Sequence, residues 1–334
     1  MKVKHTYFPA FDVFRGFAII AVMLAHTPGF RNILDPIRPL GVLGVHMFFA
    51  LSGFLITHRF LEEAQQTGGV ALKGFYKRRA RRILPPAAIY LAVLAVLGPV
   101  LHWLPTNKAE ITSALLFYRN LYQAPAPYGW YTGHFWSLSI EEEFYMAWPV
   151  LLVALGVRTR RARWGTLAVI VATAAWRIFV FRADPAANYY RPDLLADHLV
   201  WGCLIALLWK DINQKITPRL RMIMGVAGIT IATTLLYTMP PYWQPIFAMC
   251  VAVGFIFSAD ASRRWCDKLP PLKTLGEASY DIYIWQSLFL PLPFAASALP
   301  WMQRVPWGYA CIAAVSSASF LLTFPRKRRS AALG

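Results

Sequence analysis

Arg15 and His26 stand eleven residues apart in an apolar segment near the start of the chain. At about 100° per residue, this spacing returns both side chains to one face of a helix, roughly 16 Å apart along its axis. Asp12 lies one turn before Arg15 and can orient it through a charge-assisted hydrogen bond. Of Arg15 and His26, one side chain is therefore expected near the cytoplasmic surface and the other well inside the membrane. The alternatives are that Arg15 extends to the membrane surface and that His26 is a hydrogen-bonded polar residue inside a helix bundle.

Three consecutive carboxylates, Glu141, Glu142 and Glu143, occupy a second apolar segment. They spread over about 200° of a helix, so at least two must face a cavity or a cationic partner instead of lipid. His46 and His26 are expected at a comparable depth, in the outer half of a membrane. A carboxylate that holds one imidazole nitrogen leaves the other nitrogen as a base. The same groups would also suit a proton relay in a transporter.

A dense basic run precedes a third apolar segment, with five cations in the six residues from Lys77 to Arg82. Arginine side chains bind phosphate groups through two parallel hydrogen bonds, so the run suits a polyphosphate ligand. The alternative is simple anchoring to anionic lipids on the cytoplasmic side.

These residues all lie in or beside long apolar stretches, and 57% of the chain is hydrophobic while only 15% is charged. A helix needs roughly 20 apolar residues to cross a membrane. The sequence therefore predicts an all-α integral membrane protein of about ten transmembrane helices. It also predicts one transmembrane domain over residues 1–334, without an appended soluble domain. The expected spans are 12–30, 39–58, 86–104, 134–156, 164–181, 193–209, 222–238, 242–258, 279–299 and 306–324.

The basic residues lie in short clusters in alternate connections between the expected spans. Of the 34 Lys and Arg residues, 25 fall on the side of the N-terminus, eight fall on the other side, and Arg15 lies within the first span. Positive residues are retained in the cytoplasm during insertion, which predicts that both termini lie there. The formal charge of +18 is spread over helix ends and forms no groove, so nucleic acid is not an expected partner.

Other segments give weaker indications. The first apolar stretch lacks a cleavage site and is expected to be retained as a helix. The four cysteines have no spacing typical of a metal site or a disulfide.

The longest connection, 105–133, is predicted to form a short interfacial helix within 111–122 and then an irregular outer segment. Its aromatic residues Tyr122, Tyr128, Trp130 and Tyr131 are candidates for stacking on a ligand, for core packing or for anchoring at the membrane interface.

Five motifs recur in order along the chain: FDVFRG with the later His26, GVHMFFALSGFLI at 44–56, FYKRRARRILPP at 75–86, HFWSLSIEEEFY at 134–145 and GEASYDIYIWQ at 276–286. Together they resemble membrane-bound acyltransferase family 3, whose bacterial members O-acylate glycans and some small molecules. The resemblance covers essentially the whole chain. His46 stands where the family commonly has Asp and Gln286 where it commonly has His, so neither is given the family's role.

The resemblance implies an O-acyltransferase that uses acyl-CoA, typically acetyl-CoA, as a co-substrate and binds no permanent cofactor. It implies that Arg78, Arg79 and Arg82 hold the phosphates of the coenzyme, with Arg15 near the donor. His26 is then the general base, and Glu141, favoured over Glu142, orients it or stabilises the imidazolium. An acyl-histidine intermediate is an alternative. The acceptor is a hydroxyl of a glycan, a lipid-linked sugar or a small molecule. The rival hypothesis is a proton-coupled transporter or flippase.

Overall fold

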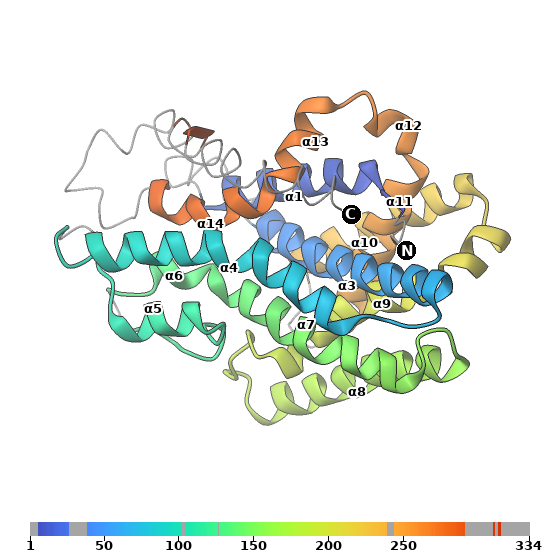
Figure 1. The fold of residues 1–334 in the computed structure, drawn as a ribbon, viewed down its shortest axis with the longest axis horizontal. Coiled ribbons are helices and arrows are strands. Elements are labelled where there is room, and N and C mark those ends of the chain that lie inside the picture. The colour runs from blue at the N-terminus through green and yellow to red at the C-terminus, as the bar shows by residue number, and fades with distance from the viewer. Residues whose placement is uncertain are drawn as a thin grey trace. The chain divides into compact units, whose positions relative to one another are not determined.

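The computed structural model describes residues 6–26, 39–101, 104–125, 127–238, 244–290, 310 and 313–314. Every regular element in these ranges is a helix (Figure 1), so the all-α prediction is confirmed for the described part of the chain. Within it, six helices are long and apolar enough to cross a membrane. They are α3 (Pro39–Thr67), α4 (Leu72–Leu97), α8 (Arg160–Ala183), α9 (Pro192–Lys215), α10 (Pro218–Thr238) and α11 (Gln244–Ala261).

Two further predicted spans correspond to helices outside this group of six. Helix α1 (Pro9–Ala25) has 17 residues, slightly fewer than a membrane crossing needs. Helix α7 (Phe135–Leu155) has sufficient length but carries the three glutamates. The predicted span at 279–299 begins as α14 (Ser279–Phe289), and the rest of it, like most of 306–324, lies outside the described residues. The number of ten spans and the cytoplasmic termini therefore stay predictions.

The chain divides into two compact units. The first comprises residues 1–22, 39–72 and 140–277, and the second comprises 23–38, 73–139 and 278–334.

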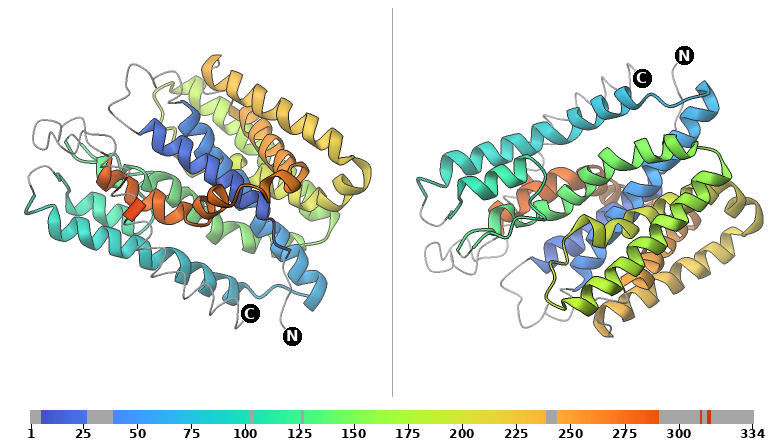
Figure 2. Two further views of the ribbon diagram at one scale, coloured as in Figure 1. Left: turned by 90° about the horizontal axis from the view of Figure 1, so that it is seen from above. Right: turned by 90° about the horizontal axis from the view of Figure 1, so that it is seen from below.

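In the first unit, α3 and α9 are central, because 72% of the apolar window of each is buried, against 28% for α8 and 22% for α10. Helix α9 packs against α3, α8 and α11, and α10 packs along α11 (Figure 2). Glycines allow the closest approach. A Cβ atom on Gly53 of α3 would collide with the carbonyl of Leu199, and one on Gly202 of α9 with that of Ala50. Small residues at such positions bring membrane helices into backbone contact.

A second close approach joins α1 to α13 (Pro270–Glu277), which follows the short helix α12 (Arg263–Cys266). A Cβ atom on Gly16 would collide with the Leu272 carbonyl, and one on Gly276 with the Asp12 carbonyl. Both glycines belong to motifs that the sequence singled out. Their contacts hold the Asp12–Arg15 turn of α1 against α13.

The second unit contains α4, α5 (Lys108–Leu115), α6 (Trp130–Gly133) and α14. The helix predicted within 111–122 is present as α5, but it begins and ends earlier. Asn107 and Glu110 form a reciprocal capping box that begins it. Phe117 has a φ of 54°, which is incompatible with continuing a helix.

Helix α4 also begins earlier than predicted. The apolar pattern indicates a start at 86, whereas the helix starts at Leu72 and contains Pro85 and Pro86 in its interior. The basic run therefore forms the first turns of the helix itself. The two prolines have no N–H, so the carbonyls of Arg81 and Arg82 lack their usual helical donors.

Candidate functional site

Arg15 is fixed by its neighbours on α1 and α3. Its Nη1 atom lies 3.6 Å from Asp12 Oδ1, which is an ion pair one turn apart, as the spacing predicts. The Tyr7 hydroxyl donates to Asp12 Oδ2 at 2.7 Å, so the carboxylate bridges Tyr7 and Arg15. The guanidinium also lies 6.0 Å from the centre of the Phe48 ring on α3.

Glu141 accepts one hydroxyl hydrogen bond at each carboxylate oxygen. The Ser52 hydroxyl on α3 donates to Oε1 at 3.0 Å, and the Tyr145 hydroxyl, one turn further along α7, donates to Oε2 at 2.9 Å. Hydrogen bonds to an ionised group are stronger than those between neutral groups. Glu141 is therefore held as an oriented carboxylate. Glu142 and Glu143 are half-buried like Glu141, and none of the three is fully exposed.

One face of α3 receives both of these charged groups. Phe48, beside Arg15, and Ser52, beside Glu141, are separated by one helical turn. Phe48, Ser52 and Leu55 are half-buried, while the residues between them are buried. The first unit thus brings Arg15 and Glu141 to one partly accessible stripe of α3, which the sequence motifs alone do not reveal.

His26 directly follows α1, is exposed, and belongs to the second unit. Its ring centre lies 6.4 Å from that of Trp130, at an angle of 65°. Glu141 belongs to the first unit, so the predicted support of His26 by Glu141 stays a prediction.

The fourth and fifth motifs contact each other in the second unit. The Tyr283 hydroxyl donates to the His134 carbonyl at 3.0 Å, and His134 Nδ1 lies 2.9 Å from the Ser287 hydroxyl. The Ser137 hydroxyl lies 2.7 Å from that of Tyr283. Gln286, which departs from the family pattern, is fully buried, and neither polar atom of its side chain has a hydrogen-bond partner among the described residues.

The predicted phosphate-binding arginines lie on one side of α4. Arg78 and Arg82 are exposed and Arg79 is half-buried. Their positions fall within an arc of about 100° around the helix. The Tyr280 hydroxyl of α14 donates to the Ile83 carbonyl at 2.9 Å, which fixes the helix just beyond the basic run. The arrangement presents three guanidinium groups that can reach a common anion.

A buried arginine organises the segment between α5 and α6. Arg119 donates through Nε to the Thr132 hydroxyl at 3.0 Å and through Nη1 to the Tyr122 carbonyl, and the Thr132 hydroxyl donates to Glu110 at 3.0 Å. Burial lowers the pKa of Arg119, and the nearby Glu110 carboxylate opposes that shift. Tyr131 is buried, and its carbonyl accepts from the Tyr90 hydroxyl at 2.6 Å, so Tyr131 serves packing. Tyr128 is exposed.

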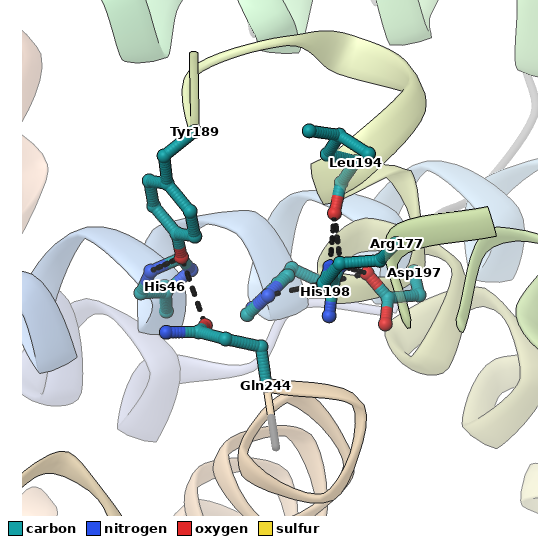
Figure 3. Close-up of polar contacts among 7 residues, drawn as sticks. All are labelled: His46, Arg177, Tyr189, Leu194, Asp197, His198 and Gln244. Carbon is teal, nitrogen blue, oxygen red and sulfur yellow. Dashed lines mark hydrogen bonds and ion pairs between the residues drawn. The ribbon is translucent and has the colours of Figure 1, made fainter. Parts of the chain in front are cut away.

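The first unit contains a second polar cluster, which the sequence analysis missed (Figure 3). Arg177 is one of the eight basic residues that the sequence predicts on the side opposite the N-terminus, but it is fully buried in α8 and paired with Asp197 of α9. The rings of His46 and His198 lie 4.0 Å apart. The available signal was the Asp197–His198 pair within the predicted span 193–209, because ionisable residues are costly inside a membrane. We define the buried polar cluster as the buried residues His46, Arg177, Asp197 and His198 together with the half-buried Tyr189 and Gln244, which are hydrogen-bonded to each other.

Among the residues that the structure describes, no group of three or more His, Cys, Asp or Glu side chains is arranged to hold a metal ion. Cys203, Cys250 and Cys266 are buried free thiols, and Cys311 lies outside the described residues.

These helices, several of which bury ionisable side chains, define a polytopic membrane protein. Residues 8–324 match the acyltransferase 3 family, described as an acyltransferase domain, and the chain belongs to this family. It is 26% identical over 317 residues to the peptidoglycan O-acetyltransferase OatA of Listeria monocytogenes, covering 85% of this chain and 49% of that protein.

It is also 27% identical over 315 residues to the O-acetyltransferase OatA of Staphylococcus aureus, covering 84% of this chain and 50% of that protein. A putative O-acetyltransferase of Staphylococcus aureus strain COL is 26% identical over the same length, with 84% and 50% covered. The chain thus spans about half the length of the curated relatives it matches. No solved structure matches it.

Proposed function

We propose that this protein is an integral-membrane O-acyltransferase that moves an acyl group, typically acetyl, from acyl-CoA to a hydroxyl group of a glycan. Family membership over residues 8–324 supports the reaction class. The observation that carries the proposal is that Arg15 and the doubly hydrogen-bonded Glu141 contact the same stripe of α3, at Phe48 and Ser52. Peptidoglycan, named for the Listeria relative, is the first acceptor to test.

In the proposed reaction, His26 removes the proton from the acceptor hydroxyl. The oxygen attacks the thioester carbonyl, the carbon–sulfur bond breaks, and the coenzyme leaves as a thiolate that takes up a proton. Glu141 orients His26 or stabilises its imidazolium, with Glu142 as the less favoured alternative. The exposure of His26 supports this role, because a base must come within hydrogen-bond reach of its substrate.

Arg78, Arg79 and Arg82 are proposed to bind the coenzyme's phosphates, and Arg15 to lie close to the donor. Their position on the first turns of α4, just before the apolar part of that helix, supports donor binding at a membrane surface. Acyl-CoA is available only in the cytoplasm, so these residues belong at the cytoplasmic face. The protein is proposed to lie in the inner membrane, with about ten spans and both termini inside.

A transporter or flippase with a His–Glu proton relay is the rival. The discriminating experiment supplies acetyl-CoA labelled in the acetyl group to purified protein in lipid nanodiscs, together with soluble peptidoglycan fragments. Label recovered in a base-labile ester on the glycan supports an acyltransferase. Unlabelled glycan after prolonged incubation, with several glycan acceptors tried, contradicts the proposal, since a transporter moves its substrate without altering it.

A further inference from the structure

We propose that the buried polar cluster of the first unit binds a hydroxyl group, in a site separate from the residues proposed for acyl transfer. Five polar side-chain atoms of this cluster are buried and have no hydrogen-bond partner among the described residues: His46 Nδ1, Arg177 Nη1, Asp197 Oδ2, and both ring nitrogens of His198. Buried polar groups are almost always hydrogen-bonded. Five uncompensated atoms in one place would cost as much as a domain's net stability.

The hydrogen bonds of Tyr189 determine whether His46 Nδ1 requires a hydrogen-bond donor or an acceptor. The Tyr189 hydroxyl donates its single proton to Gln244 Oε1 at 2.8 Å. Burial raises the pKa of Tyr189, so the phenol keeps that proton. The contact of 3.3 Å between His46 Nε2 and the Tyr189 oxygen must then be donated by the imidazole. A neutral imidazole with its proton on Nε2 presents a lone pair at Nδ1, which requires a donor.

The other atoms include donors as well as acceptors. Arg177 donates through Nε to the Leu194 carbonyl at 2.6 Å and through Nη2 to Asp197 Oδ1, which leaves Nη1 as a donor. Asp197 Oδ2 is an acceptor. The neutral ring of His198 has one nitrogen of each kind. The Arg177–Asp197 ion pair has no net charge, so the cluster favours neither an anion nor a cation as its ligand.

A hydroxyl group meets these requirements, because it donates one hydrogen bond and accepts others. Water and a sugar hydroxyl share this chemistry. A buried water typically makes about three hydrogen bonds to otherwise unsatisfied groups. The sugar alternative rests on the proposed glycan acceptor, whereas the site itself does not depend on acyl transfer.

The decisive variant is His198→Phe, because neither ring nitrogen of His198 has a hydrogen-bond partner among the described residues, and Nε2 lies 3.9 Å from Asp197 Oδ1. The substitution largely preserves the shape of the ring. If a bound hydroxyl satisfies the cluster, removing His198 leaves that ligand and its neighbours unpaired, and the melting temperature in nanodiscs falls by several degrees. His198→Asn, which keeps a donor and an acceptor, should recover part of the loss. A rise or no change with His198→Phe overturns the proposal, since replacing an unsatisfied polar group by an apolar one stabilises a protein.

A second measurement does not depend on variant folding. A high-resolution structure of the wild-type protein should show density within hydrogen-bond distance of His46 Nδ1 and Asp197 Oδ2, and its absence overturns the proposal. Adding methyl N-acetylglucosaminide identifies the source. A melting temperature that rises in the wild type but not in His198→Phe indicates a sugar hydroxyl, and equal responses indicate water. Neither measurement requires acyl-CoA, so failure here leaves the proposed function intact.

Discussion

Glu141 in the first unit and His26 in the second have opposite surroundings. Glu141 has a hydroxyl donor at each carboxylate oxygen, and Arg15 of α1, which contacts Phe48 of α3, is paired with Asp12. His26 is exposed at the end of α1, with the edge of an aromatic ring nearby. Preorganised charges stabilise a transition state without the cost of rearrangement, whereas a base must reach the substrate's proton. The difference indicates that the charged groups are fixed while the proposed base, His26, is accessible.

The largest effect is expected for His26→Ala, which removes the proposed base and leaves the apolar helix intact. Loss of a general base typically lowers the rate about 10²- to 10⁴-fold. The transfer rate and the amount of membrane-inserted protein are measured together. A well-folded variant with near-normal transfer would show that His26 is not the base.

The next largest effect is expected for Arg79→Ala combined with Arg82→Ala, which removes two of the three proposed phosphate contacts. Each lost charge-assisted contact should raise the KM for acyl-CoA about tenfold or more, with a smaller change in the KM for the glycan. Steady-state kinetics with each substrate varied in turn measures both constants. Two unchanged KM values would assign the basic run to membrane anchoring alone.

Gly276→Ala tests how firmly the Arg15 turn is held in the first unit. The added methyl group meets the Asp12 carbonyl, and overpacking of this kind typically costs about 1–3 kcal/mol. The melting temperature should fall and activity should fall with it. Gly69→Ala is the matched control, because its Cβ would meet nothing within 4 Å, and its melting temperature should be unchanged. Equal melting temperatures for the two variants would show that the α1–α13 contact does not hold the Arg15 turn in place.

Tyr145→Phe should have the smallest effect, because it removes one of the two donors to Glu141 and keeps the ring. The expected loss of rate is about three- to tenfold, corresponding to one hydrogen bond. Tyr90→Phe is the control, since that hydroxyl donates to the Tyr131 carbonyl and should affect stability more than rate. If Tyr145→Phe lowers only the melting temperature, its hydroxyl serves folding alone.

Much of the fold could be predicted because long apolar segments can only be helices in a membrane. The Asp12–Arg15 pair also followed from spacing, since both residues lie on one helix. The buried polar cluster could not be predicted, because Arg177 and Asp197 pair across two helices and single-sequence periodicity does not pair helices. The location of Arg177 near the end of a predicted span suggested the outer surface, whereas packing against α9 buries it.

The partners of Glu141 gave no signal for a different reason. Serine is inexpensive in membrane helices because its hydroxyl can bond to a carbonyl of its own helix, and tyrosine is common near membrane interfaces. Ser139, for example, donates to the Phe135 carbonyl at 2.9 Å. The sequence therefore does not indicate which hydroxyl group contacts the carboxylate, and only the structure shows that Ser52 donates to Glu141.

The role of Glu141 as the working carboxylate is tested most directly by comparing Glu141→Gln with Glu142→Gln. Both substitutions keep the size of the side chain and remove its charge, at positions about 100° apart on α7. We expect Glu141→Gln to lower kcat/KM about tenfold or more, because it loses a charged hydrogen-bonded group. Glu142→Gln should be milder, with both variants melting like the wild type. Full activity in Glu141→Gln together with an inactive Glu142→Gln would contradict the account and place the working carboxylate on another side of α7.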